Sequence, residues 1–250
     1  MIGSQRKPTL EAWGVSDLGL VRQNNEDSWA IDASLRVAIV ADGMGGALCG
    51  EVASAMTIET IMSYLRDTLA VGAPEQVIDE AIREANRRVF ERSRIDEGCA
   101  GMGSTVVLAY WDIPRLIIAN VGDSRAYLWR DGAITQLSYD QTLVNELRLR
   151  FGLSEQEVSN FPHKNVLTHA VGTQNELLIR RCEETLTPGD VVLLCSDGLS
   201  GPVSEASIAA TLSRDNALQD QAAQLINQAK AAGAPDNVTC VLLRYNDWEI

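Results

Sequence analysis

The sequence predicts an α+β fold of mainly antiparallel sheets with helices in separate blocks, and three observations support this fold class. Short apolar runs occur in pairs whose connections, such as Arg130-Asp131-Gly132, are long enough only for an antiparallel hairpin. Segments with helical spacing occur as two consecutive pairs and do not alternate with the strands. No linker or block of charge divides the 250 residues, so we expect a single domain over residues 1–250.

Each expected element follows from its hydrophobic period and its turn residues. Residues 37–41 are too short an apolar run for a helix and end at an Asp-Gly breaker, so they indicate a strand. Further strands are expected at residues 10–15, 28–31, 105–111, 115–121, 124–129, 133–137, 177–183, 191–196 and 238–245. Apolar side chains at helical spacing predict helices at residues 53–69, 73–92, 204–212 and 217–232. Residues 138–174 are polar and irregular, with short helical pieces near 143–149 and 154–158, and predict a mobile surface segment.

The composition excludes several classes of protein. The net charge of -13 argues against non-specific binding to nucleic acid or to an anionic membrane, because both favour a basic surface. No apolar run is long enough for a membrane span or a signal sequence, so we expect a cytoplasmic protein. The cysteines form no Cys-x-x-Cys pair and have mostly apolar neighbours, so we expect all of them to be reduced core residues. They are Cys49, Cys99, Cys182, Cys195 and Cys240.

Acidic side chains lie next to the ends of several predicted strands. Asp42 and Asp197 follow the carboxyl ends of two apolar runs. Glu26, Asp27 and Asp236 precede the amino ends of others. These two kinds of strand end share one edge of an antiparallel sheet, so we expect the carboxylates to lie close together there. Crowded carboxylates repel one another and either take up protons or bind cations, and we expect cations.

The expected metal donors are all oxygen atoms. Carboxylates and the Gly43 carbonyl, without paired His or Cys, favour Mg²⁺ or Mn²⁺ over zinc or copper. If two ions share Asp42, the site can generate a hydroxide nucleophile, which suits hydrolysis of a phosphate ester. Arg22 lies in the same loop as two of the acids, and its planar guanidinium can bind phosphate oxygens. The alternative for Arg22 is a surface ion pair.

At these residues the sequence resembles the metal-dependent protein phosphatases of type 2C, as a bacterial-type member with a single domain, over nearly its whole length. The matching signatures, in the family's order, are Arg22-x-x-Asn25-Glu-Asp27, Ala41-Asp-Gly-Met-Gly-Gly46, Gly103-Ser-Thr105, Asn120-Val-Gly-Asp-Ser-Arg125, Cys195-Ser-Asp-Gly198 and Asp236-Asn237. The resemblance implies a four-layer α-β-β-α sandwich, with two sheets packed face to face, helices on both outer faces and a dinuclear Mn²⁺/Mg²⁺ centre at one end. It also implies a flap at about residues 140–175 beside the active site.

The resemblance implies metal-binding roles for four residues. Asp42 would bridge the two ions, and the Gly43 carbonyl would bind one of them. Asp197 and Asp236 would bind the other ion.

Four more residues receive roles by the same resemblance. Glu26 and Asp27 would act near the ions mainly through water, and Arg22 would hold the phosphate. Asp123 would help to bind a third, weaker metal ion; its alternative is an ordinary aspartate of a hairpin turn.

One departure from the family concerns proton donation. Many eukaryotic members have a histidine, proposed as the general acid, where this chain has Met44, although bacterial-type members often lack it. Methionine cannot donate a proton, so metal-bound water or another group would take that role. The two histidines, His163 and His169, lie in the irregular segment and are surface or packing residues in one reading. In the other reading, His169 contacts the substrate or acts as the acid.

The resemblance implies a protein phosphatase that hydrolyses phosphoserine and phosphothreonine by attack of metal-activated water. Its partners would be Ser/Thr-phosphorylated proteins and a Ser/Thr kinase whose signalling it reverses, and we expect a monomer. One alternative is a non-catalytic regulator of the same fold that binds phosphoproteins. Another is a hydrolase of small phosphate esters such as nucleotides.

Overall fold

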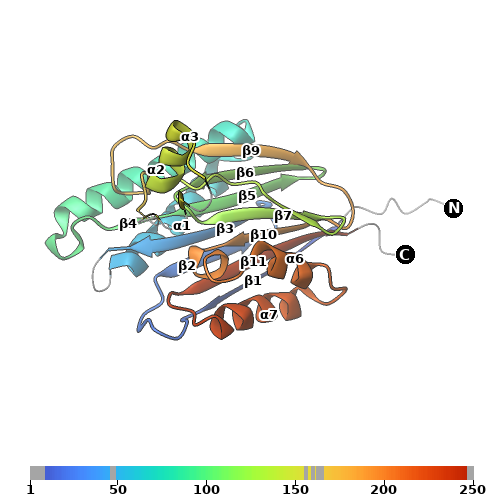
Figure 1. Ribbon diagram of the computed structural model, residues 1–250. Coiled ribbons are helices and arrows are strands. Elements are labelled where there is room, and N and C mark those ends of the chain that lie inside the picture. The colour runs from blue at the N-terminus through green and yellow to red at the C-terminus, as the bar shows by residue number, and fades with distance from the viewer. Residues whose placement is uncertain (1–8, 46–48, 155–156, 159–160, 162–165, 247–250) are drawn as a thin grey trace.

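Two antiparallel sheets pack face to face in the computed structural model, which describes residues 9–45, 49–154, 157–158, 161 and 166–246 (Figure 1). The strands of the first sheet are, in spatial order, β1 (Thr9–Asp17), β11 (Val238–Asn246), β10 (Val191–Cys195), β7 (Arg125–Arg130) and β8 (Ala133–Gln136). Those of the second are β2 (Asp27–Asp32), β3 (Val37–Met44), β5 (Val106–Asp112), β6 (Arg115–Val121) and β9 (Arg180–Thr185). A short β4 (Gly103–Ser104) pairs with the end of β3.

Helices cover both outer faces of this sandwich (Figure 1). Two long helices, α1 (Cys49–Thr68) and α2 (Pro74–Ile95), pack on the second sheet. On the first sheet lie α6 (Glu205–Leu212) and α7 (Leu218–Ala231). Shorter helices connect the layers: the 3-10 helix η1 (Glu97–Cys99), α3 (Leu143–Phe151) and α5 (Asp197–Ser200). The predicted α+β fold with a four-layer α-β-β-α order is therefore confirmed.

The alternating side chains of the central strands divide the interior into three apolar layers. On β3, Val37 and Ile39 contact the α1–α2 layer, whereas Ala38 and Val40 face the other sheet. Strand β10 alternates in the same way between the helix layer and the space between the sheets. Because both faces of these strands are buried, they have continuous apolar sequences although the sheets are antiparallel.

Most element boundaries differ from the predicted ones by only a few residues. Strand β9 begins at Arg180 and not at residue 177, because its neighbour β6 pairs with it only from Asn120↔Arg180 to Arg115↔Thr185. Helix α1 begins at Cys49, ahead of the predicted residue 53. Short elements such as η1 and α5 were not predicted, since one helical turn has no hydrophobic period.

The expectation of five reduced core cysteines is wrong for three of them. Cys49 and Cys99 form a disulfide, with Cα atoms 5.3 Å apart, that joins the start of α1 to the end of η1. The two are 50 residues apart in sequence, so only the packing of α1 beside η1 brings them together. Cys182 lies half-exposed on the edge strand β9, whereas Cys195 and Cys240 are buried and free as expected.

The segment predicted as a flap contains α3, one backbone bridge within the segment and one bridge to β4. Thr142 caps α3 by accepting a hydrogen bond from the Asn145 N–H at 3.3 Å. Isolated antiparallel bridges join Thr142 to Leu167 and Ser104 to Val171. Part of the second helical piece, residues 154–158, lies outside the described residues. In the part of the chain that the structure describes, no helix is long and apolar enough to cross a bilayer.

Candidate metal and phosphate site

The sheet edge places the predicted acidic residues around one cleft of about 690 Å³. Asp27 and Asp42 are paired neighbours on β2 and β3, Asp197 begins α5 just after β10, and Asp236 precedes β11. The predicted residues that line the cleft are Arg22, Glu26, Asp42, Gly43, Asp123, Asp197 and Asp236. Asp27 is the exception, because it is buried and does not line the cleft.

Hydrogen bonds fix the backbone of Asp42. Its N–H donates to Thr105 Oγ1 at 3.0 Å, and its carbonyl accepts from the Thr105 N–H at 2.8 Å and from Ser104 Oγ at 3.1 Å. Thr105 Oγ1 also lies 2.6 Å from the buried Ser124 Oγ. These hydroxyl residues belong to two of the quoted signatures, but no local pattern in the sequence indicates their role. They hold the main chain in place while the Asp42 carboxylate faces the cleft.

Two glycines allow separate segments to approach the site closely. A Cβ atom on Gly43 would lie 1.9 Å from the Gly50 carbonyl oxygen and 2.7 Å from that of Glu26. One on Gly198 would lie 1.8 Å from the carbonyl oxygen of Asn237. No side chain fits at such distances, so these positions require glycine for close backbone packing.

Asn237 connects the loop that contains Arg22 to the start of β11. Its side-chain oxygen accepts from the Glu26 N–H at 2.9 Å, and its amide nitrogen donates to the carbonyls of Leu18 and Asn24 at 3.0 and 2.9 Å. The side chain is buried, so these bonds have little competition from water. Asn237 belongs to one of the quoted signatures, and its position directly after a predicted metal ligand is the only signal of its role that the sequence offers.

Asp27 is a buried carboxylate with one satisfied oxygen. Oδ2 accepts a hydrogen bond from Ser196 Oγ at 2.7 Å, whereas Oδ1 has no hydrogen-bond partner among the described residues. Burial, together with the nearby charges of Asp197 and Asp236, raises the pKa of Asp27 to about 7. An unpartnered oxygen beneath the cleft is consistent with the predicted contact through water, because water or an ion can satisfy it.

The carboxylates of the cleft disfavour one another's charge. Burial first, and then the charges of Asp27 and Asp197, raise the pKa of Asp42 well above its ordinary value. Burial and the charge of Asp197 raise the pKa of Asp123 to about 7, and burial and Asp236 raise that of Asp197. A bound cation would relieve this repulsion without protonation.

The donor atoms fit a hard cation that keeps much of its own water. Asp42, Asp197, Asp236 and the Gly43 carbonyl offer only oxygen ligands, as Mg²⁺ and Mn²⁺ prefer. Among the described residues, no group of three or more His, Cys, Asp or Glu side chains lies close enough together to hold a metal ion by itself. An open arrangement of this kind suits Mg²⁺, which usually keeps several water ligands and takes only one or two carboxylates.

Arg22 lies at the mouth of the cleft and pairs with its acids. It donates to Asp236 Oδ2 at 2.7 Å and lies 3.6 Å from Glu26 Oε2. The hydrogen bond to Asp236 is the main reason why the pKa of Arg22 is raised. The ion pair anticipated as the alternative is therefore present, and it also aims the guanidinium at the cleft, where further N–H groups can bind an anion.

The Asp123 turn connects the two sheets. It leads from β6 in one sheet to β7 in the other, so the hairpin-turn alternative for Asp123 is wrong.

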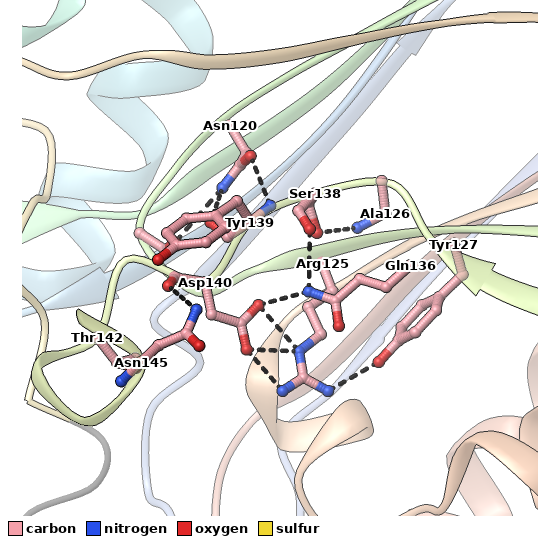
Figure 2. A network of polar contacts seen from close by, with 11 residues as sticks. Asn120, Arg125, Ala126, Tyr127, Gln136, Ser138, Tyr139, Asp140, Thr142 and Asn145 are labelled. Atoms are coloured by element: carbon pink, nitrogen blue, oxygen red, sulfur yellow. Dashed lines mark hydrogen bonds and ion pairs between the residues drawn. The ribbon is translucent and has the colours of Figure 1, made fainter. Parts of the chain in front are cut away.

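Just beyond the Asp123 turn, Arg125 binds Asp140 through Nε and Nη2, with the Nη2 contact at 2.6 Å, and donates to the Tyr127 hydroxyl at 2.8 Å (Figure 2). Asn120 binds both backbone groups of Tyr139 that face it. This network joins the base of the flap segment to the Asp123 turn.

Met44 lines the cleft, as expected for its position after Asp42-Gly43. Among the described residues His169 is not part of the cleft lining, and its Nδ1 lies 3.2 Å from Thr168 Oγ1. His163 lies outside the described residues. The geometry therefore does not support His169 as the acid.

The fold and the site define a class of proteins: two-sheet sandwiches with an acidic cleft at one end of the sheets. Comparisons with known proteins agree with this class. The family model for protein phosphatase 2C matches residues 20–242. The serine/threonine phosphatase stp of Listeria innocua is 33% identical over 237 residues, which cover 92% of this chain and 94% of that protein.

Solved structures extend the comparison to three dimensions. The serine/threonine phosphatase PstP/Ppp of Mycobacterium tuberculosis superposes with a TM-score of 0.87 at 35% identity, covering 95% of this chain and 99% of the other. The catalytic domain of PstP in complex with two manganese ions has a TM-score of 0.86 at 34% identity, with 96% and 100% covered. The chain belongs to the protein phosphatase 2C family. The predicted family and the predicted enzyme class are confirmed.

Proposed function

We propose that this chain hydrolyses phosphoserine and phosphothreonine in proteins at the acidic cleft, with two Mn²⁺ or Mg²⁺ ions as cofactors. The observation that carries the proposal is the convergence of Asp42, Asp123, Asp197 and Asp236 around one cleft with Arg22 at its mouth. The relatives' names as serine/threonine phosphatases and the two manganese ions of PstP support it.

Different residues of the cleft would bind the different metal ions. Asp42 and the Gly43 carbonyl would hold one ion, and Asp42, Asp197 and Asp236 the other. Asp123 would bind a third ion more weakly. The ions, when bound, supply an activated water nucleophile and offset the charge of the phosphate.

The remaining residues of the site would bind the phosphate and orient water. Arg22 would exchange part of its pairing with Asp236 for the phosphate oxygens, since a guanidinium has five donors in a fork that matches phosphate. Glu26 and Asp27 would orient water beside the ions. Met44 has no proton to give, so water or another group of the cleft would supply the proton to the leaving serine or threonine oxygen.

Three further expectations form part of the proposal. The substrates would be proteins phosphorylated by a serine/threonine kinase whose signalling this chain reverses, and the chain would act as a monomer in the cytoplasm. The non-catalytic alternative is less well supported, because Asp42, Asp197 and Asp236 are all present at the cleft.

The test is release of inorganic phosphate from a phosphothreonine peptide. We expect turnover with Mn²⁺, none with EDTA, and a loss of at least about 100-fold for Asp197→Asn in Mn²⁺, because a neutral amide replaces a charged ligand. The exposed Asp215→Asn serves as the matched control and should behave like the unaltered protein. Bound Mn²⁺ without turnover would favour the regulator. Faster turnover of nucleotides than of phosphopeptides would favour the small-ester hydrolase.

A further inference from the structure

A second groove, of about 720 Å³, opens from the acidic cleft and runs between α3 and the segment from Asp197 to Pro202. It shares three residues with the cleft, namely Asp123, Asp197 and Asp236. Its volume lies within the roughly 300–1,000 Å³ range of ligand-binding pockets. A ligand whose phosphate occupies the cleft therefore has a continuous path into this groove.

The wall of the groove is held in place by the network of Figure 2. Arg125 and Asp140 both line the groove, and their bidentate ion pair offsets the charge of each. The Asn145 side chain donates to the Asp140 carbonyl at 2.8 Å, which attaches the first turn of α3 to this pair. The α3 side of the groove is thus fixed before a ligand arrives.

Arg148 is the second arginine of the groove and, among the described residues, it forms no ion pair, although Glu205 lines the hollow beside it. It lies exposed on α3, and within the described residues no carboxylate lies within 4.0 Å of its guanidinium, in contrast to Arg125. It also lines an adjoining hollow of about 450 Å³, which extends the groove along α3. In a chain of net charge -13, this arginine is a local positive site beside an acidic cleft.

We propose that this groove binds the substrate polypeptide on one side of the phosphorylated residue, and that Arg148 favours substrates with an acidic side chain there. Two observations favour this occupant. The groove is continuous with the cleft that would hold the phosphate, and the positive charge of Arg148 complements an acidic side chain. The inference rests on the proposed function, because the neighbours of the phosphorylated residue reach the groove only when its phosphate occupies the cleft.

The experiment uses the full chain with saturating Mn²⁺ and a series of phosphothreonine peptides. Each peptide carries Asp, Ala or Lys at one position, moved stepwise to either side of the phosphothreonine, and kcat and KM are measured separately. We expect Asp to raise kcat/KM over Ala by about twofold to fivefold at low salt, mainly through KM, as for one exposed ion pair. The preference should occur on one side only and weaken at high salt.

Charge variants of α3 assign the preference to one residue. Arg148→Ala should abolish it, Arg148→Lys should retain it, and Arg148→Glu should replace it by a preference for Lys. Arg150→Glu is the matched control, since it makes the same charge change on the same helix but lies outside the groove lining. It should keep the preference for Asp.

Two results would overturn the inference while leaving the proposed function intact. One is turnover with no preference at any position, and the other is an equal change for Arg148→Glu and Arg150→Glu, which would indicate overall charge only. Failure to hydrolyse both the peptides and p-nitrophenyl phosphate in Mn²⁺ would overturn the proposed function and this inference together.

Discussion

At the scale of single residues, the acids in and beneath the cleft differ in how many hydrogen-bond partners the fold gives them. Asp236 is bound by Arg22 and by the Asn237 N–H, whereas Asp27 is buried with one oxygen unpartnered. These hydrogen bonds compensate the charge of Asp236 even without a metal ion. Asp27 is a buried charge that only a proton, water or an ion can compensate.

Asp27→Asn separates the effect of this buried charge on stability from its effect on metal binding. The amide keeps the shape but removes the buried charge, so we expect a higher melting temperature in EDTA at pH 8. We also expect affinity for Mn²⁺ to fall about 10- to 100-fold, as for other groups that support a metal site from behind its ligands. Thermal melts and calorimetric titration measure the two effects. A lower melting temperature in EDTA would contradict the charge argument.

Gly43→Ala tests the close backbone approach at the same site. Its Cβ would lie 1.9 Å from the Gly50 carbonyl oxygen, so β3 and α1 must separate. We expect a loss of about 1–3 kcal/mol in the free energy of unfolding, measured by urea denaturation, together with weaker Mn²⁺ binding. Gly98→Ala is the control, because its Cβ would meet its nearest neighbour at 3.4 Å. Equal stabilities of the two variants would refute the packing argument.

At the scale of elements, the disulfide joins α1 to η1, on either side of the segment that contains α2. The bond closes a loop over a sequence separation of 50 residues. Chain-entropy arguments give about 4 kcal/mol for a loop of this size, and measured effects are typically about 2–4 kcal/mol. The cross-link therefore contributes to holding the start of α1 beside η1.

Reduction should lower the free energy of unfolding only in proteins that contain the Cys49–Cys99 disulfide. We expect dithiothreitol to reduce the free energy of unfolding by about 2–4 kcal/mol, measured by urea denaturation. Cys99→Ser should unfold at the lower denaturant concentration with or without the reductant, whereas Cys182→Ser should remain sensitive to it. Insensitivity of the unaltered protein would show that the bond does not form in solution.

At the scale of the whole molecule, the charge of the cleft couples folding to pH. Asp27 and Asp123 have pKa values of about 7 in the fold, above the ordinary value of 3.8. The folded protein therefore binds more protons than the unfolded chain between about pH 4 and pH 7. The stability that these groups contribute is fully present below about pH 4 and is lost as the pH rises through about 7.

Metal ions should reverse this trend, because they bind the deprotonated carboxylates. We expect the melting temperature in Mn²⁺ to exceed that in EDTA by a margin that grows from about pH 5 to pH 8. Differential scanning calorimetry at matched ionic strength measures the margin. The Asp215→Asn protein should show the same dependence, and a margin independent of pH would rule out coupling to these carboxylates.

The sequence alone determined the features that repeat locally. Hydrophobic period and turn residues located the long helices and most strands, and Arg130-Asp131-Gly132 indicated the hairpin of β7 and β8 correctly. Antiparallel order then sufficed to place Asp42, Asp197 and Asp236 at one edge. The order of the signatures indicated the family.

Only the tertiary structure decided what depends on contacts between distant segments. The Cys49–Cys99 bond, the role of Asn237, the pairing of Arg22 with Asp236 and the groove at Arg148 have no local pattern. Each joins segments whose separation along the chain carries no information about their distance in space. Periodicity reports which face of an element is buried, whereas the packing of the elements determines which side chains meet.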